Sequence, residues 1–260
     1  MANQVTESIL SLTHANVHSR LLEIGVGTGR IALPLYKRGY DITGIDLSRL
    51  MMEQLVKKTL PHADSAGQSD AARATMQMHA TPRSRISLAQ ADMARLPFAS
   101  DSFDGVIAVH VLHLSPAWRE AVSDVRRVLT RGAPLLASWH HRESYSPNRI
   151  LRDKLAKFAL EYGVNAARPG AAGNDDIRAE FGRWGTAVEL VDVVSWEERM
   201  SVGVILAAID RQIFSDTWLI PRPVMDKLMP RLREFAQSEF GPPEREVVEP
   251  ATFTWIIARK

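Results

Sequence analysis

Short apolar runs alternate with amphipathic segments over residues 20–140 of the chain. A short apolar run bounded by turn residues is typical of a buried strand, whereas apolar positions three and four residues apart are typical of a helix. The expected strands are residues 20–24, 41–46, 86–92, 103–110 and 133–139, and the expected helices between them are residues 31–38, 50–58 and 116–129. This alternation predicts a parallel, doubly wound sheet whose ligand crevice lies beyond the carboxyl ends of the strands.

The rest of the chain breaks this pattern in two places. Residues 61–85 are rich in Ala, Ser, Gln, Asp and His without a strong apolar period, so we expect a peripheral insertion or a weak helix there. After residue 145, helices dominate. The expected helices are residues 150–162, 177–184, 202–214 and 224–240, and the expected strands are residues 188–195 and 253–258. The predicted organisation is one compact domain with a sheet-forming half, 1–145, and a remainder with a helical cap, 146–260.

Composition narrows the class of protein. The chain has 260 residues, 45% of them hydrophobic, which is enough for a large core. There is no cysteine, and the first twenty residues lack the pattern of a secretory signal, so a cytoplasmic location is expected. No apolar run approaches the roughly 20 residues of a membrane span. The net charge of +2 is spread along the chain, so nucleic acid is not an expected partner.

A glycine turn follows the first expected strand and reads Glu23-Ile-Gly25-Val-Gly27-Thr-Gly29-Arg30. Glycines allow positive φ and a close approach of the backbone to a ligand, and the next helix begins with N–H groups that lack partners. A dinucleotide fingerprint, G-x-G-x-x-G, would need a third glycine where Arg30 stands. A purely structural turn without a ligand is the alternative.

Asp46 lies at the end of the second expected strand, about 20 residues beyond the first glycine. A carboxylate in this position can accept hydrogen bonds from both hydroxyls of a ribose. The alternative is a role at the start of the helix that Ser48 is expected to cap. Position and residue type together favour the ribose role.

Four segments in this order resemble the successive motifs of class I S-adenosylmethionine-dependent methyltransferases. They are Leu21-Leu-Glu-Ile-Gly-Val-Gly-Thr-Gly29, Gly44-Ile-Asp-Leu-Ser48, Ala91-Asp-Met-Ala-Arg-Leu-Pro-Phe98 with Asp101-Ser-Phe-Asp104, and Val125-Arg-Arg-Val-Leu129. The chain is most similar to the methyltransferase type 11 group, which includes ubiquinone and menaquinone methyltransferases. The resemblance implies a Rossmann-like α/β fold with a mostly parallel, seven-stranded sheet, an antiparallel last strand and a helical cap inserted between the final strands.

The resemblance also implies S-adenosyl-L-methionine as cofactor and a role for each matching position. The glycines would wrap the methionine part, with Glu23 orienting the turn near the amino acid moiety. Asp46, beside Leu47, would hold the ribose, and Asp92 would accept from the adenine amine. Met93 would pack on the adenine ring, with core packing as its alternative, and His110 would face the methionyl end through its backbone carbonyl. The implied cofactor residues are Glu23, Gly25, Gly27, Gly29, Asp46, Leu47, Asp92, Met93 and His110.

The sequence departs from the family pattern at two places. Thr130-Arg131-Gly132 replaces the usual Pro-Gly-Gly before the fifth strand, which leaves the shape of that turn open. Only about nineteen residues precede the first strand, so the N-terminal helix that often covers the cofactor is expected to be truncated and the site more open.

Methyl transfer to a hydroxyl or phenol would benefit from a base, and histidine titrates near neutral pH. Four histidines are expected at the crevice: His110, His113, His140 and His141. Of these, His113 and His140 are the candidate catalytic bases. No ligand set for a metal is evident. Residues 196–223, with Arg199, Arg211, Phe214 and Trp218, would form the lid over the acceptor, following the resemblance.

The predicted activity is transfer of a methyl group to an O, N or C atom of a small-molecule acceptor by in-line displacement. A nicotinamide-dependent oxidoreductase is one alternative, although Arg30 and the Asp92 segment speak against it. A catalytically silent methyltransferase-like binding module is another, because a fold does not determine a function. A homodimer is left open.

Overall fold

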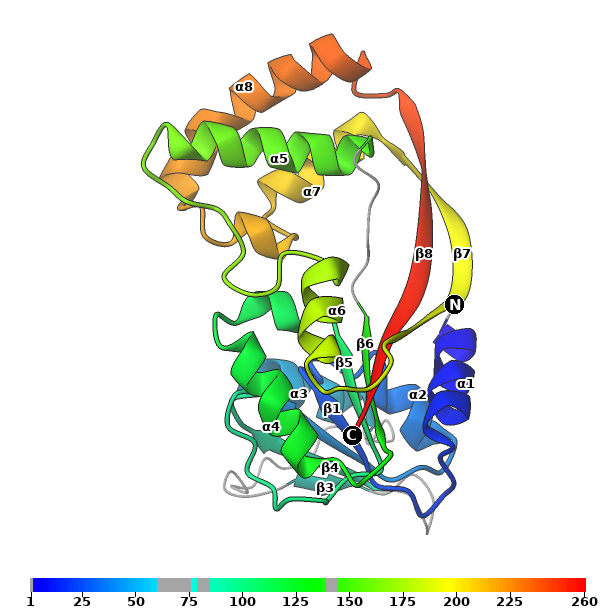
Figure 1. Cartoon of the computed structure of the whole chain (residues 1–260). Helices are drawn as coiled ribbons and strands as arrows, with labels where there is room; N and C mark the ends of the chain where they lie inside the picture. The colour runs from blue at the N-terminus through cyan, green and yellow to red at the C-terminus, as the bar shows by residue number, and fades with distance from the viewer. Residues whose placement is uncertain (1, 60–75, 79–84, 139–144) are drawn as a thin grey trace, which may run out of the picture.

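Figure 1 shows a layered α/β body with a group of helices above it. The computed structural model describes residues 2–59, 76–78, 85–138 and 145–260. Within these residues, eight strands form a sheet in the order β3-β4-β2-β1-β5-β6-β8-β7. The strands are β1 (Leu21–Ile24), β2 (Ile42–Asp46), β3 (Met76–Met78), β4 (Ile86–Gln90), β5 (Gly105–Val109), β6 (Pro134–Ser138), β7 (Glu189–Ser201) and β8 (Glu246–Arg259).

The strand directions confirm the predicted sheet. β4, β2, β1, β5 and β6 pair in parallel, β8 pairs antiparallel with β6, and β7 pairs antiparallel with β8. β7 therefore runs in the same direction as β4, β2, β1, β5 and β6, and β8 runs against these six strands. This is the direction pattern predicted for the seven-stranded sheet. The eighth strand, β3, pairs antiparallel with β4 and corrects part of the expectation of an insertion or weak helix at 61–85. The remainder of that stretch, 60–75 and 79–84, lies outside the described residues.

Helices cover both faces of the sheet. The helices are α1 (Ala2–Thr13), α2 (Ala32–Lys37), α3 (Arg49–Thr59), α4 (Trp118–Val128), α5 (Pro147–Leu160), α6 (Asn174–Gly182), α7 (Val202–Asp210) and α8 (Arg222–Phe240), with short 3₁₀ turns η1 (Leu112–Leu114) and η2 (Ser215–Thr217). α1, α2 and α3 share one apolar cluster with the sheet, and α4 and α6 share the cluster on the opposite face. α1 is a helix of 12 residues that packs against α2, β6 and β7, and the expectation of a truncated helix over the cofactor stays a prediction.

The central strands explain this two-sided burial. Successive side chains of a strand point to opposite faces, and in β5 Val106 and Ala108 belong to one cluster while Ile107 and Val109 belong to the other. All five residues of β5 are buried. A strand that is apolar on both faces is typical of a parallel sheet covered by helices on each side.

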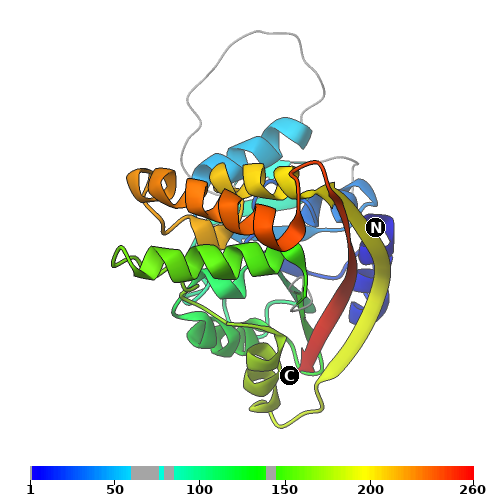
Figure 2. The ribbon, with the colours of Figure 1, turned by 90° about the horizontal axis from the view of Figure 1, so that it is seen from above.

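A second body of helices, the cap, lies above the carboxyl edge of the sheet and consists of α5, α7 and α8. Its helices have their own apolar cluster, which includes Leu155, Leu206 and Leu232. β7 and β8 pair over twelve positions, and only Ile256–Arg259 of β8 pair with β6, so the ribbon they form continues beyond the sheet to the cap. Figure 2 shows α5 (green), α7 (yellow) and α8 (orange) side by side above the body, with the ribbon along one side.

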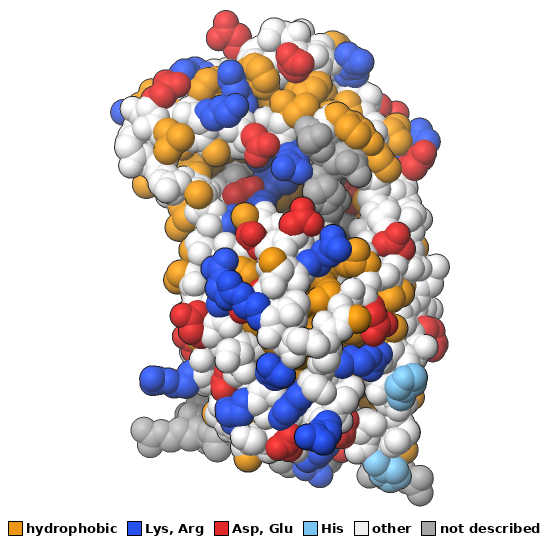
Figure 3. Space-filling model, in the orientation of Figure 1, with side chains coloured by type: hydrophobic (Ala, Val, Ile, Leu, Met, Phe, Trp, Pro, Cys, Tyr) orange, Lys and Arg blue, Asp and Glu red, His pale blue; other side chains and the backbone are white. Residues whose placement is uncertain are grey.

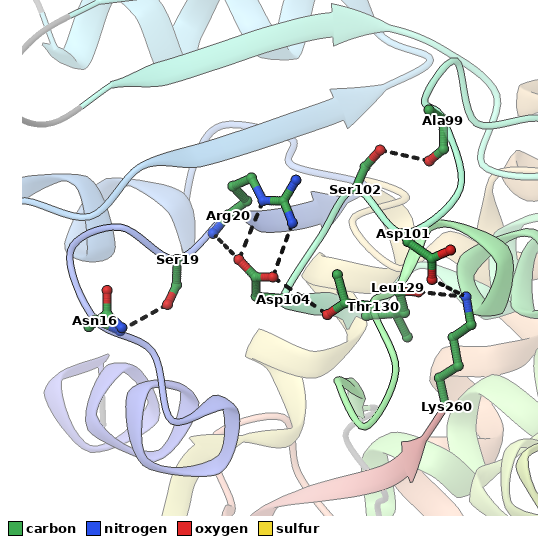
Figure 4. A network of polar contacts seen from close by, with 10 residues as sticks. All are labelled: Asn16, Ser19, Arg20, Ala99, Asp101, Ser102, Asp104, Leu129, Thr130 and Lys260. Atoms are coloured by element: carbon green, nitrogen blue, oxygen red, sulfur yellow. Dashed lines mark hydrogen bonds and ion pairs between the residues drawn. The ribbon is translucent and has the colours of Figure 1, made fainter.

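A polar network ties the amino edge of the sheet (Figure 4). Asp104, just before β5, accepts hydrogen bonds from the backbone N–H of Arg20 at 2.9 Å and from the Arg20 guanidinium at 3.2 Å. Lys260, the last residue, donates to the Asp101 carboxylate and to the Leu129 carbonyl, both at 2.7 Å. These contacts join the starts of β1 and β5 to the chain end. Among the helices of the described part of the chain, none combines the length and apolar character that crossing a bilayer requires.

Candidate active site

The predicted glycine turn connects β1 to α2 at the carboxyl edge of the sheet. Gly25, Gly27 and Gly29 all have positive φ, at 71°, 52° and 83°. The backbone N–H groups of Gly25 and Val26 both donate to the carbonyl of Ile45 on β2, at 2.8 and 2.9 Å. The turn is therefore fixed to the neighbouring strand at the edge where a ligand is expected.

Packing explains why two of these glycines carry no side chain. A Cβ on Gly25 would lie 2.6 Å from Cγ2 of Val111, and a Cβ on Gly29 would lie 2.2 Å from Cδ1 of Leu55. Both separations are too short for carbon atoms in contact. Gly25 thus allows the loop after β5 to close on the turn, and Gly29 allows α3 to do so.

Asp46 ends β2 and holds the glycine turn. Its Oδ2 accepts from the Gly27 N–H at 2.8 Å, and its Oδ1 accepts from the Ser48 N–H at 2.7 Å. Ser48 caps α3 as expected, because its hydroxyl accepts from the Met51 N–H at 3.3 Å. A carboxylate has about four acceptor positions, so Asp46 can make both contacts and still accept from a ligand. The two interpretations of Asp46 are therefore compatible.

Glu23 on β1 is a buried acid beneath the turn. Its side chain is 3% exposed, and its Oε2 has no hydrogen-bond partner within the described part of the chain. Burial raises the pKa of Glu23 well above its ordinary value, and the hydrogen bond from the Ala32 backbone and the charge of Arg30 only partly oppose this. A buried carboxyl oxygen without a partner is costly, so it is well suited to a ligand that brings a positive or donating group.

The ends of β2 and β4 carry the residues predicted to contact adenine. The Ala91 N–H donates to the carbonyl of Asp46 at 3.2 Å, and the Gln90 side chain donates to the carbonyl of Leu47 at 2.9 Å. Asp92 is exposed and its Oδ1 accepts from the Ala94 N–H at 2.9 Å. The structure therefore brings Asp46, Leu47 and Asp92 to one edge. The side chain of Leu47 is exposed there.

Met93 is buried in the apolar cluster beneath α4, together with Leu96 and Trp118. This packing corresponds to the alternative considered for Met93. Its proposed contact with the adenine ring stays a prediction.

His110 and His113 follow β5. His110 has a positive φ of 53°, and its N–H donates to the carbonyl of Ser138 on β6 at 2.9 Å. His113 lies in η1 and is 7% exposed, and its Nε2 is 3.0 Å from the hydroxyl of Ser215 in η2. Burial, followed by the charge of Arg168, lowers the pKa of His113 to about 4, which the carboxylate of Asp216 only partly opposes. His140 and His141 lie outside the described residues.

A cavity of about 1330 Å³ lies between the carboxyl edge of the sheet and the cap. Arg30, His110 and His113 line it from the side of the sheet, and residues of α5, α6, β7, β8 and η2 line it from the other sides. Figure 3 shows a hollow at this level, with acidic and basic side chains around its opening. The volume is enough for a small organic molecule beside the end of a cofactor.

The structure changes the list of residues expected over the acceptor. Phe214 and Trp218 line the cavity as predicted for the lid, whereas Arg199 pairs with Glu197 at 2.7 Å and does not line the cavity. Sequence reasoning missed Arg152, Arg168 and Asp216, which line the wall beneath the cap. No motif marks them, because they come from three separate segments that only the fold brings together.

Comparisons with known proteins agree with this geometry. A family model described as "Methyltransferase domain" matches residues 22–137. A phosphatidylethanolamine N-methyltransferase of Cereibacter sphaeroides is 30% identical over 163 residues, which is 62% of this chain and 71% of that protein. An O-methyltransferase of Pyrenophora dematioidea is 26% identical over 178 residues, 62% of this chain and 59% of that protein. The solved structure of the YcgJ protein of Bacillus subtilis has a TM-score of 0.60 at 17% identity, with 99% of each chain covered.

The fold and the edge that carries Glu23, the glycine turn and Asp46 define a Rossmann-like methyltransferase. The chain belongs to the class I S-adenosylmethionine-dependent methyltransferases, and S-adenosylmethionine is its methyl donor. These similarities give no support to the nicotinamide-dependent alternative.

The residues of the turn fit this cofactor. Glu23 Oε2 is a buried acceptor that suits an amino acid ammonium. Asp46 offers carboxylate oxygens for ribose hydroxyls at the adjacent strand end. The assignment of each of these residues to a part of the cofactor stays a prediction.

Proposed function

We propose that the chain transfers a methyl group from S-adenosylmethionine to an O, N or C atom of a small molecule bound in the cavity beneath the cap. The observation that carries the proposal is the position of this cavity, which reaches from Arg30 and His110 beside the glycine turn to η2 and α5 of the cap. The relatives named above include an N-methyltransferase and an O-methyltransferase, which supports methyl transfer and leaves the acceptor atom open.

The protein's contribution would be orientation and exclusion of water. The cofactor, when bound, supplies a methyl group on a sulfonium that is already electrophilic, so no protein nucleophile is needed. Glu23, the glycine turn and Asp46 would hold the donor in one orientation, and the cap would hold the acceptor in line with it. Orientation of this kind supplies roughly 7 to 11 kcal/mol in favourable cases.

His113 and His140 stay the proposed proton acceptors for a hydroxyl substrate. The pKa of about 4 keeps His113 neutral at physiological pH, which is the form that accepts a proton, but also makes it a weaker base than free imidazole. A substrate with a neutral amine would not need such a base before transfer, because its lone pair is already available.

The test is release of S-adenosylhomocysteine in the presence of phenols, quinol precursors, amines and carboxylic acids as acceptors. We expect turnover with at least one acceptor class and none without an acceptor. Binding of S-adenosylmethionine with uniform silence across the panel would favour the binding-module alternative and contradict the proposal.

A further inference from the structure

Among the described residues, four large apolar side chains line the cavity and are nevertheless exposed to solvent. They are Leu114 of η1, Leu190 of β7, and Ile213 and Trp218 of the segment between α7 and α8. Ile213 and Trp218 are 60% and 59% exposed, the largest fractions of the four. Apolar surface that lines a cavity and is left open to water is typical of a site that a ligand covers.

Residues 211–220, the cap loop, begin with a fixed turn at the end of α7. Gln212 has a positive φ of 53°, a conformation that glycine adopts more readily than other residues. The Gln212 N–H donates to the carbonyl of Ile209 at 2.9 Å, and the Ile213 N–H donates to the carbonyl of Ala208 at 3.1 Å. These two hydrogen bonds form the Schellman motif that ends many helices. The point at which Ile213 leaves the helix is therefore fixed.

The exposure of Ile213 is unusual for its position in this motif. An apolar residue two positions beyond the C-cap frequently packs back against the last turn of the helix. Ile213 occupies this position after the C-cap residue Arg211, yet most of its side chain is exposed and it lines the cavity. The turn thus leaves apolar surface on the side of the cavity.

The side chain of Gln212 fixes the rest of the cap loop. Its Nε2 donates to the carbonyls of Thr217 and Ile220, at 2.7 and 2.8 Å, and its backbone carbonyl accepts from the indole Nε1 of Trp218 at 2.9 Å. The Thr217 hydroxyl donates to the carbonyl of Phe214 at 2.6 Å. The Trp218 ring is therefore held at its polar end while much of its apolar surface stays open. A ligand that packs on a side chain held in this way pays little ordering entropy.

The cap loop lies next to the segment that follows β5. His113 Nε2 is 3.0 Å from the hydroxyl of Ser215, and Leu114, the next residue, lines the same cavity. His110 and Arg30 line this cavity beside the glycine turn. The exposed apolar side chains and the sheet edge expected to hold the methyl donor therefore belong to one cavity.

Charged side chains near the cap loop pair with one another. Asp216 of η2 pairs with Arg168 at 2.8 Å and with Arg152 of α5, and these three residues form a charged cluster in the cavity wall. Arg152 also lies over the ring of Phe214, at 4.8 Å from its centroid. Because charges of opposite sign are paired here, the exposed apolar side chains are the feature that distinguishes this part of the cavity.

We propose that Leu114, Ile213 and Trp218 form a subsite for the apolar body of the methyl acceptor, whose nucleophilic group reaches toward His110 and the glycine turn. The substrate class is therefore an amphipathic molecule with a polar reacting group and an aromatic or aliphatic body. Binding removes from water the apolar surface that the three side chains expose. This inference rests on the proposed function, because it assigns the occupant of the same cavity.

The test is calorimetric titration of phenol, 2-naphthol and 4-butylphenol into the protein saturated with S-adenosylhomocysteine. The three compounds carry the same hydroxyl group and differ in their apolar bodies. We expect at least one of the two larger compounds to bind about fivefold or more tightly than phenol, because it buries more apolar surface. A preference for 2-naphthol would assign the subsite to a planar body, and a preference for 4-butylphenol would assign it to a flexible chain. Equal affinity for all three compounds, or binding of none, would overturn the proposal.

Substitutions in the cap loop test where the apolar body binds. Trp218→Ala and Ile213→Ala should each lower the affinity of the preferred larger compound relative to phenol by about threefold or more, because each removes apolar surface from the subsite. Leu219→Ala is the matched control, since Leu219 belongs to the same loop and is 50% exposed but does not line the cavity. It should leave the ratio unchanged. An unchanged ratio in either cap-loop variant, or an equal fall in Leu219→Ala, would contradict the assignment.

Binding of S-adenosylhomocysteine separates loss of recognition from loss of structure. All three variants should bind it as the wild type does, because the glycine turn and Asp46 lie outside the cap loop.

The same experiments distinguish this inference from the proposed function. If compact polar acceptors are methylated while 2-naphthol and 4-butylphenol bind no better than phenol, the apolar subsite is wrong and the proposed function stands. If the larger compounds bind at the cap loop but no acceptor is methylated, the proposed function fails and the cap loop remains a binding site for an apolar ligand.

Discussion

Gly25 and Gly29 show at the residue scale how packing and function meet in one turn. Each combines a positive φ with a position where a Cβ would collide with Val111 or Leu55. The sequence predicted these glycines because the turn has a recognisable pattern. The pattern did not predict the partners, since Val111 and Leu55 reach the turn from other segments.

His113 makes the stability of the protein depend on pH. Its pKa falls from 6.5 in the unfolded chain to about 4 in the folded chain, so its contribution is present above pH 6.5 and is lost as the pH falls toward 4. By pH 4 the loss should amount to about 3 kcal/mol of unfolding free energy. The stability of His113→Gln relative to the wild type should therefore rise by about this amount between pH 7 and pH 4, measured by urea denaturation.

Ser215→Ala is the matched control for this prediction. It removes the hydroxyl near Nε2 but leaves the histidine buried, and burial is the largest cause of the lowered pKa. The variant should retain most of the pH dependence. A constant difference between His113→Gln and the wild type over this pH range would contradict the account.

At the scale of elements, the start of β5 depends on Asp104. Burial raises its pKa, but the hydrogen bonds from the backbone and side chain of Arg20 outweigh this effect and the pKa of Asp104 is lowered overall. The stabilisation is thus present above the ordinary pKa of an aspartate and is lost in acid. Asp104 belongs to a segment that resembles a family motif, and the structure assigns it to the amino edge of the sheet, far from the cap (Figures 1 and 4).

Replacing Asp104 with Ala should lower the free energy of unfolding by about 1 to 2 kcal/mol at pH 7, because it removes charge-assisted hydrogen bonds at a partly exposed site. Denaturation in urea measures the loss. Asp175→Ala, at an exposed acid 3.6 Å from Arg178, is the control and should change stability by less than about 0.5 kcal/mol. Equal effects of the two substitutions would show that Asp104 has no special role.

The elements themselves were largely predictable from the apolar pattern. β1, β5 and β6 are buried throughout and have short apolar runs, and α4 has its buried residues at helical spacing. The length of β7 was not predicted, because the expected strand was 188–195 and β7 continues to Ser201. No residue of β7 is buried, so the strand lacks the continuous apolar run that marks a buried strand.

At the scale of the whole molecule, the sheet edge that carries the glycine turn could be predicted from the sequence, whereas the cavity beneath the cap could not. The edge with Glu23, the glycine turn and Asp46 lies within short stretches of chain, so its motifs could be recognised. The cap cavity is lined by segments that extend from Arg30 to Thr254, and its charged cluster joins positions 152, 168 and 216. Such a site depends on long-range packing, which no local pattern of residues encodes.

The most direct test of the central claim is calorimetric binding of S-adenosylhomocysteine to the wild type, to Asp46→Ala and to Asp101→Ala, with NAD titrated in parallel. Asp101 lies at the opposite edge of the sheet, where Lys260 contacts it, and serves as the control. We expect one site in the wild type and in Asp101→Ala, and a loss of about 1.5 to 3 kcal/mol, or roughly 10- to 150-fold in affinity, in Asp46→Ala. Unchanged affinity in Asp46→Ala, or tight binding of NAD without binding of S-adenosylhomocysteine, would contradict it.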